Sequence, residues 1–239
     1  ENGVASFNGR TGAVMPQSGD YNATQIPVSG EPKAETVAAA LSNKAPAGYG
    51  LGEQSKELTS DDDLNTIWQN GWYRWGSRSP QNAPKMTSDA GGAGYIFARV
   101  TNYDAQNVLQ EYWSLNQGAQ NQARRICRNG VWGPLEWINP PMKLGVEYRT
   151  VESYNNKPVY AKAISFGQAP NATYKDVSHG IENFGQLVSY TGMMGGANLI
   201  ETPALDSIQI NASNIRITTN SDVSASYVYL VLRYTKTTD

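Results

Sequence analysis

Residues 226–235 read SYVYLVLRYT, and their side chains alternate with the period of two that is expected of a β-strand. One face of this strand carries Val228, Leu230, Leu232 and Tyr234. The other face carries Tyr227, Tyr229, Val231 and Arg233. A strand that offers one large apolar face covers a core, so the stretch predicts a mainly β structure for the C-terminal part of the chain.

Further strand-like segments begin soon after Leu144. We expect strands over 158–166, 186–192, 206–210 and 214–219. Short strands separated by turns are typical of an antiparallel β-sandwich or jelly roll. Asn139-Pro140-Pro141 marks the start of this part, because paired prolines cannot continue a strand ladder. We therefore place a β-sandwich head domain at residues 142–239.

Residues 57–141 contain all six tryptophans and predict a small α+β domain. Thr59 or Ser60 is a suitable cap for a short helix over 61–68, with carboxylates in its first turn. Asn129-Gly130 indicates a tight hairpin between segments 120–128 and 131–138. The remaining strands are expected over 71–75, 93–100 and 108–115.

Residues 1–56 hold too few large apolar side chains for an independent core. Asn8-Gly9 predicts a hairpin within 4–14, and residues 31–44 predict one helix. The apolar stripe of this helix is narrow, so a single copy is marginal in water. Packing against copies from neighbouring subunits would stabilise it. We expect a short stem of hairpin plus helix, followed by a linker over 47–53.

Charge and composition exclude several classes of partner. The chain carries 19 Lys+Arg against 21 Asp+Glu, without the clustered basic stripe of nucleic-acid-binding proteins. No apolar run approaches the roughly 20 residues that span a bilayer, so we expect no membrane insertion. Cys127 is the sole cysteine, which excludes an intrachain disulfide, and a small buried apolar role suits it.

Groups that could catalyse a reaction or bind a metal are scarce. His179 is the sole histidine, and its place in a turn favours a hydrogen-bonded structural role. A metal held by three copies of His179 on a trimer axis is an alternative. Asp61-Asp62-Asp63 could form a cation site or a glycosidase pair, but adjacent helical residues point in different directions. Charge at a helix N-terminus explains them more simply. We expect no enzyme, no metal and no cofactor.

Three segments resemble known families. Residues 4–21, with FNGRTGAV, then Pro16 and GDY, resemble a module that recurs in bacteriophage tail fibres and tail-like bacteriocins. Asn82-Ala83-Pro84 and the NGVWGPLEW stretch at 129–137 resemble the knob domain of pyocin and phage tail fibres. Residues 157–167 and 177–183 resemble C-terminal head domains of phage receptor-binding proteins.

These resemblances imply a homotrimeric tail-fibre tip, located outside the cell on the virion or tailocin. Its parts would be a trimeric stem and linker (1–56), a pyocin-knob-like domain (57–141) and a receptor-binding head (142–239). The expected function is adhesion to a bacterial host, through a surface polysaccharide or another receptor. Other tail proteins would attach through a part that precedes residue 1. The alternatives are a polysaccharide-degrading or deacetylating tail enzyme, and a structural connector without receptor contact.

Binding residues are expected in the turns of the head, because loops on a rigid sheet concentrate binding groups. The candidates are Tyr154, Asn155, Asn156, Asn171, Tyr174 and Asn198. Asparagine-rich turns also form for backbone reasons alone, which is the competing explanation. Tryptophans could stack on sugar rings, but for Trp68, Trp113 and Trp132 we favour core packing.

Overall fold

The computed structural model describes residues 54–86, 94–115 and 121–239, together with isolated residues before Gln54. These isolated residues are Ser6, Gly9–Thr11, Met15, Asp20, Asn22, Thr24, Ile26 and Thr36–Ala38. The chain divides into two units, Glu1–Gln54 and Ser55–Asp239. The predicted N-terminal hairpin, most of the helix over 31–44 and the linker over 47–53 lie outside the described residues. In the described part, no helix has the length and apolar character to cross a membrane.

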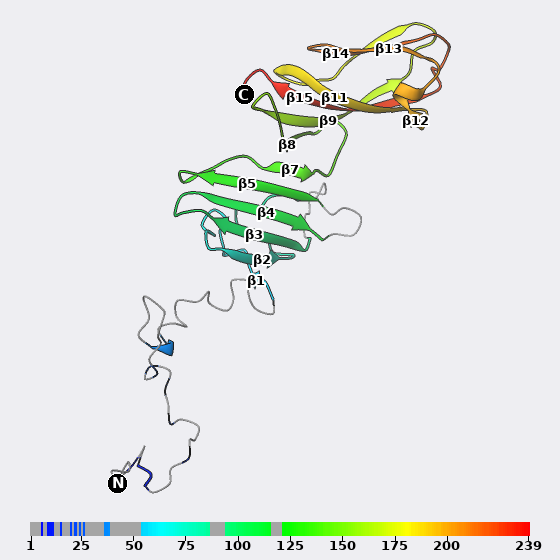
Figure 1. Ribbon diagram of the computed structural model, residues 1–239. Coiled ribbons are helices and arrows are strands. Elements are labelled where there is room, and N and C mark those ends of the chain that lie inside the picture. Colours follow the sequence, from blue (N-terminus) through cyan, green and yellow to red (C-terminus); the bar gives the residue numbers. More distant parts are fainter. Residues whose placement is uncertain are drawn as a thin grey trace. The chain divides into compact units, whose positions relative to one another are not determined.

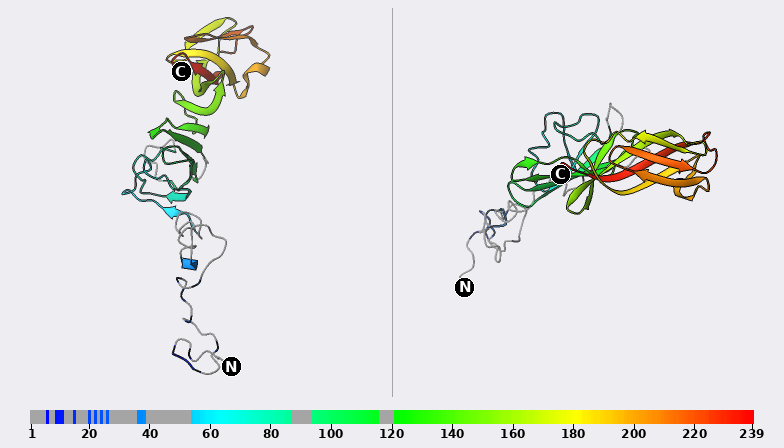
Figure 2. Two further views of the ribbon diagram at one scale, coloured as in Figure 1. Left: turned by 60° about the vertical axis from the view of Figure 1, so that its left-hand side comes forward. Right: turned by 90° about the horizontal axis from the view of Figure 1, so that it is seen from above.

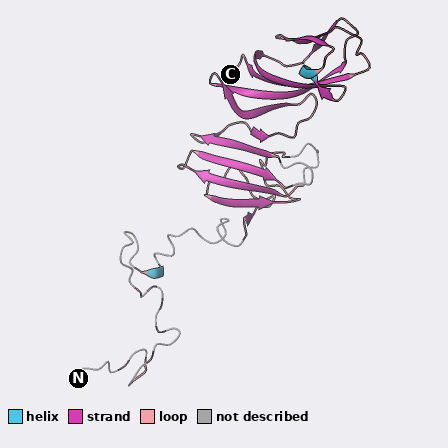
Figure 3. Ribbon diagram, turned by 45° about the vertical axis from the view of Figure 1, so that its right-hand side comes forward, coloured by secondary structure: helices cyan, strands magenta, loops and turns pink. Residues whose placement is uncertain are grey.

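The regular elements of the second unit are strands apart from one short 3₁₀-helix, which confirms the mainly β fold class (Figure 3). In the knob region, residues 57–141 with the adjoining edge strand, the strands are β1 (Lys56–Glu57), β2 (Gly71–Trp75), β3 (Ile96–Asn102), β4 (Val108–Ser114), β5 (Gln122–Arg128), β6 (Val131–Trp132) and β7 (Glu136–Asn139). In the head region, residues 142–239, the elements are β8 (Glu147–Tyr154), β9 (Lys157–Gln168), β10 (Tyr174–Ser178), β11 (Phe184–Met194), β12 (Ala197–Asn198), the 3₁₀-helix η1 (Leu199–Glu201), β13 (Leu205–Ile210), β14 (Asn214–Thr219) and β15 (Tyr227–Lys236).

The knob sheet has the order β1-β2-β3-β4-β5-β7, with β6 also paired to β5 (Figure 1). The central pairs are antiparallel, as the predicted hairpins require. Asn129 and Gly130 both have positive φ, 51° and 80°, which is the conformation of a tight hairpin turn. The predicted hairpin at this position is confirmed.

The predicted helix over 61–68 is wrong, because this segment forms consecutive turns. Its carbonyl groups are used by side chains instead of by a helical ladder. Gln110 Nε2, from the buried face of the sheet, donates to the carbonyls of Leu64 at 2.8 Å and Ile67 at 2.9 Å. The Asp63 carboxylate accepts from the Asn65 amide at 2.8 Å, a local bond that competes with helix formation. The segment is therefore fastened to the sheet as irregular structure.

The head region is a sandwich of two sheets (Figure 1 and Figure 2). The larger contributes β8-β9-β15-β11-β12, and the smaller has the order β10-β14-β13. β7 of the knob sheet pairs in parallel with β8 through Trp137 and Thr150. Ile215 and Ile217 of the small sheet belong to the same buried cluster as Leu230 and Leu232 of β15. The predicted antiparallel β-sandwich is confirmed.

Strand β15 behaves as its alternation predicts. Val228, Leu230, Leu232 and Tyr234 are at most 1% exposed, whereas Tyr227 and Tyr229 are 55% and 44% exposed. The other predicted head strands are also present, as β9, β11, β13 and β14. The sequence interpretation missed β8 and β10, whose mixed polar composition lacks a strong apolar pattern.

Candidate binding site on the knob sheet

The two faces of the knob sheet differ in what covers them. Tyr73, Trp75 and Tyr112 point to the buried face, at most 3% exposed. Their neighbours along the strands point to the opposite face, because strand side chains alternate. This second face, here called the open face, carries Trp72, Arg74, Phe97, Arg99, Glu111 and Trp113. An open face with three aromatic rings is a candidate surface for binding.

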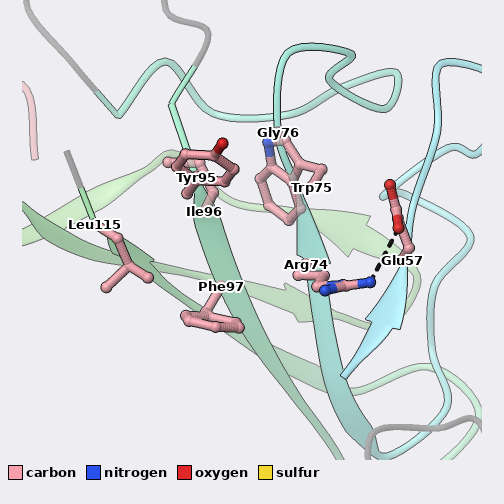
Figure 4. A pocket seen from close by; sticks show the side chains of 8 residues that line it. All are labelled: Glu57, Arg74, Trp75, Gly76, Tyr95, Ile96, Phe97 and Leu115. Carbon is pink, nitrogen blue, oxygen red and sulfur yellow. Dashed lines mark hydrogen bonds and ion pairs between the residues drawn. The ribbon is translucent and has the colours of Figure 1, made fainter. Parts of the chain in front are cut away.

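A pocket of about 210 Å³, here called the knob pocket, lies at one end of strands β2, β3 and β4 (Figure 4). Phe97 opposes Arg74 on one side and Trp113 on the other, so the pocket continues into the aromatic part of the open face. The lining residues are Glu57, Arg74, Trp75, Gly76, Tyr95, Ile96, Phe97 and Leu115.

An ion pair forms the polar wall of the pocket. Arg74 Nη2 lies 3.0 Å from Glu57 Oε2, and both side chains are partly exposed (Figure 4). Glu57 reaches this position because β1 pairs in parallel with β2, in register with Arg74. Arg74 Nε is buried and has no hydrogen-bond partner among the described residues. The wall therefore combines a carboxylate with a guanidinium.

Tyr95 forms the aromatic wall and is 74% exposed. Gly76 lies beside the Tyr95 ring: a Cβ at position 76 would be 3.8 Å from two ring carbons. The absence of a side chain at Gly76 leaves this part of the pocket open. The Leu115 amide donates to the Tyr95 carbonyl at 2.9 Å, which fixes the backbone of Tyr95 at the end of β4.

Two tryptophans extend the aromatic surface beyond the pocket. The ring centroids of Trp72 and Trp113 are 5.5 Å apart, and Arg99 Cζ lies 5.9 Å from each. Arg99 Nε donates to Glu111 Oε2 at 2.7 Å, so the guanidinium is held over both rings. The predicted core position is wrong for Trp68, Trp113 and Trp132, since none of the three is fully buried. Trp113 lies on the open face of β4, and Trp68 and Trp132 are half-buried, with each Nε1 donating to the Asn65 carbonyl.

The predicted residues Tyr154, Asn155 and Asn156 lie together in the hairpin between β8 and β9. Asn155 and Asn156 have φ of 50° and 61°, so they satisfy the backbone of a tight turn. Tyr154 is 37% exposed, and its hydroxyl accepts from Gln186 Nε2 at 3.4 Å. This hairpin lies at the end of the sandwich where β9 begins and β15 ends.

The predicted residues Asn171, Tyr174 and Asn198 lie toward the other end of β9. Asn171 forms a bridge with Asp222. Asn198 caps η1, since its side chain accepts from the Ile200 amide at 3.2 Å. Tyr174 begins β10 and is 57% exposed. The structure thus places the six predicted residues in two groups at opposite ends of the sandwich.

His179 and the aspartates have structural partners. The His179 ring is buried, with Nδ1 accepting from the Ile181 amide and Nε2 3.1 Å from the Asn211 carbonyl. Asp62 accepts from the Thr59 amide, and Asp63 accepts from Asn82 Nδ2, which keeps the pKa of Asp63 below its usual value. Among residues 54–86, 94–115 and 121–239 and the isolated residues before them, no metal-ligand cluster occurs. Cys127 is buried, as expected.

The sequence interpretation missed the knob pocket. A signal for it exists, since β2 and β3 have apolar side chains on one face and also place Trp72 and Phe97 on the other. A strand with apolar groups on both faces either lies between two layers or has one face that meets a partner.

Comparison with known proteins gives distant structural similarity only. No protein-family model and no curated protein matches the chain. A structure of an N-truncated R2-type pyocin tail fibre matches with 10% identity and a TM-score of 0.28, covering 74% of this chain and 96% of that chain. A C-terminal part of the P. aeruginosa R1 pyocin fibre matches with 12% identity and a TM-score of 0.31, covering 79% of this chain and 70% of that chain. The corresponding R2 fibre structure from P. aeruginosa matches with 10% identity and a TM-score of 0.31, covering 79% of this chain and 69% of that chain. Similarity at this level does not assign a function to the chain.

Proposed function

We propose that this chain is the adhesive end of a phage or tailocin tail fibre, and that it holds a saccharide of the host surface in the knob pocket. The tail-fibre assignment rests on the three resembling segments at residues 4–21, 82–137 and 157–183. The glycan assignment rests on one observation, the pocket in which Tyr95 and Phe97 lie beside the Arg74–Glu57 pair.

The chemistry of the pocket suits a sugar ring. Aromatic faces pack against the apolar face of a pyranose, and a carboxylate with a guanidinium can bond neighbouring hydroxyl groups. The cavity of about 210 Å³ is smaller than the roughly 300–1,000 Å³ of pockets that enclose drug-sized ligands. A single sugar residue of a longer chain is therefore the proposed occupant. Glu57 and Arg74 cancel in charge, so an uncharged residue is preferred.

Weak sites suit a multivalent particle. A shallow pocket of this kind gives low affinity, and several copies on one particle raise the overall avidity without new contacts. We propose a homotrimer, joined to other tail proteins through its N-terminal side. The outer face of the large head sheet supports self-association, because Met193, Tyr227 and Tyr229 are each 44% exposed or more. Light scattering that gives a mass near 26.0 kDa would contradict the trimer.

Retention of the purified chain on host cells tests the adhesive role. Tyr95→Ala removes the aromatic wall, and Arg74→Gln removes the polar wall. Each variant should reduce retention several-fold while leaving the thermal unfolding temperature nearly unchanged, since both side chains are partly exposed. Tyr103→Ala is the matched control, because Tyr103 is 90% exposed in the loop between β3 and β4 of the same sheet.

The outcomes separate adhesion from its alternatives. Loss of retention in Tyr95→Ala and Arg74→Gln but not in Tyr103→Ala supports the pocket. Wild-type retention in all three variants overturns it. Release of reducing ends or acetate from host polysaccharide would favour the enzymatic alternative. No retention of the unaltered chain above that on receptor-deficient cells would favour a connector.

A further inference from the structure

The small sheet of the head has one apolar and one polar face. Val177, Ile208, Ile215 and Ile217 face the sandwich core. The opposite face, here called the polar face, carries only side chains with hydroxyl, amide or charged groups. These are Tyr174, Asp176 and Ser178 of β10, Asn214, Arg216 and Thr218 of β14, and Ser207 and Gln209 of β13.

Tyr174 is a fixed aromatic ring on this face. Arg216 Cζ lies 4.4 Å from the centroid of the Tyr174 ring, within the range of a cation–π contact. Arg216 is itself held by Asp176 through two bonds, Nε to Oδ1 at 2.8 Å and Nη2 to Oδ2 at 2.7 Å. Tyr174 nevertheless remains 57% exposed. The ring is thus positioned by its neighbours and still offers most of its surface.

Hydrogen-bonding groups surround the ring in rows set by the strand register. Thr218 lies between Tyr174 and Ser207, and Arg216 lies between Asp176 and Gln209. Within the part of the chain that the structure describes, the side chains of Ser207, Gln209 and Thr218 make no hydrogen bond to protein. Their donors and acceptors are therefore available to a ligand at a spacing close to the 4.7–4.9 Å that separates neighbouring strands.

We infer that the polar face of the small sheet is a second saccharide-binding surface, which stacks an uncharged pyranose on Tyr174 and bonds its hydroxyl groups through Asp176, Arg216 and Gln209. Asp176 and Arg216 pair with each other, so neither presents an uncompensated charge to a ligand. The face carries no exposed aliphatic side chain. It also differs from the outer face of the large sheet, where Tyr227, Tyr229 and Met193 are exposed.

The ligand class of this surface rests on the proposed adhesive function, but its location does not. Two saccharide surfaces on one chain would let a single polysaccharide strand, or two neighbouring strands, be held at both the knob and the head. The second contact then acts at high effective concentration.

Saturation-transfer NMR with a panel of methyl pyranosides tests the inference. The probes are the methyl glycosides of glucose, galactose, mannose, rhamnose and N-acetylglucosamine, with methyl glucuronide as the charged comparison. All measurements use the full chain carrying Tyr95→Ala, so that the knob pocket does not contribute. Tyr174→Ala is then added, and Tyr103→Ala is added in parallel as the control, because Tyr103 is 90% exposed in the loop between β3 and β4 and lies on neither proposed surface.

The expected result is transfer to at least one uncharged glycoside in the Tyr95→Ala chain. Tyr174→Ala should weaken its binding about tenfold, the amount that one good aromatic contact contributes, and Tyr103→Ala should leave it unchanged. Tyr174→Phe should retain binding, since the ring is kept. The inference is overturned by no transfer in the Tyr95→Ala chain, by transfer that survives Tyr174→Ala, by equal loss in Tyr103→Ala, or by transfer to the glucuronide alone. Host-cell retention of the Tyr95→Ala chain is scored separately, so failure of the knob pocket and failure of this surface are distinguishable.

Discussion

The Tyr234 hydroxyl donates to Glu147 Oε2 at 2.5 Å, joining the last strand of the chain to the start of β8. β9 lies between β8 and β15 in the sheet, so this bond spans a strand that separates the two residues. Lys236 Nζ lies 2.5 Å from the other carboxylate oxygen of Glu147. Burial, and then the Glu147 carboxylate, raise the pKa of Tyr234 well above its usual value. The hydroxyl therefore stays protonated and remains a donor to Glu147.

Tyr234→Phe should lower the free energy of unfolding by about 1.5 kcal/mol, because it removes a partly buried hydrogen bond to a charged group. Urea denaturation measures the change. Tyr229→Phe is the control, since Tyr229 is 44% exposed on the same strand, and its effect should stay within about 0.5 kcal/mol. Equal effects of the two variants would show that the bond to Glu147 does not contribute.

The head should lose stability as the pH falls below about 6.5. Burial is the main cause that lowers the pKa of His179, and nearby Lys162 acts in the same direction. In the folded state Nδ1 must accept from the Ile181 amide, so the neutral ring is required. The unfolded chain takes up the proton near pH 6.5, before the folded chain does. Stability is thus complete above that pH and declines as the pH falls toward the lowered pKa.

Thermal unfolding between pH 7.5 and 5 measures this dependence, and His179→Gln provides the comparison. Glutamine does not titrate, so this variant should show a flatter profile over the same range, even if it is less stable throughout. Parallel profiles for the two proteins would mean that another group causes the loss.

Gly130→Ala should destabilise the knob by about 1–2 kcal/mol, because a residue with a Cβ is strained at the φ of 80° that the turn requires. A Cβ at Gly130 would meet no atom within 4 Å, so the cost comes from the backbone alone. Chemical denaturation, monitored by tryptophan fluorescence, measures this loss of unfolding free energy. Gly76→Ala is the control, since its Cβ would meet only the Tyr95 ring at 3.8 Å, and a similar loss there would argue against backbone strain.

Gly76→Leu should abolish most host-cell retention by filling the knob pocket beside Tyr95 while leaving the melting temperature nearly unchanged. The position borders the cavity and not the buried face, so the added side chain has room to extend into the pocket. Retention at the wild-type level, with an unchanged melting temperature, would place the receptor contact elsewhere.

Strand positions were predictable where one face of the strand is apolar or where an Asn-Gly pair marks the turn. β15 shows this through Val228, Leu230 and Leu232, and the β5–β6 hairpin shows it through Asn129-Gly130. The helix over 61–68 was mispredicted because its capping residues and aspartates also suit turns. What decided between helix and turns was Gln110, a residue more than 40 positions away whose side chain binds the carbonyls of Leu64 and Ile67.

Alternation and turn residues are local properties of the chain, so a β structure was predictable for the knob and head regions without any tertiary information. The sequence did not determine which face of the knob sheet is covered, since alternation sorts side chains into two faces without saying where another segment will pack. Long-range packing placed Trp113 and Phe97 on the open face and paired Glu57 of β1 with Arg74 of β2. The knob pocket exists because residues of β1, β2 and β3 and the residue after β4 meet at one end of the sheet, and that meeting depends on tertiary contacts.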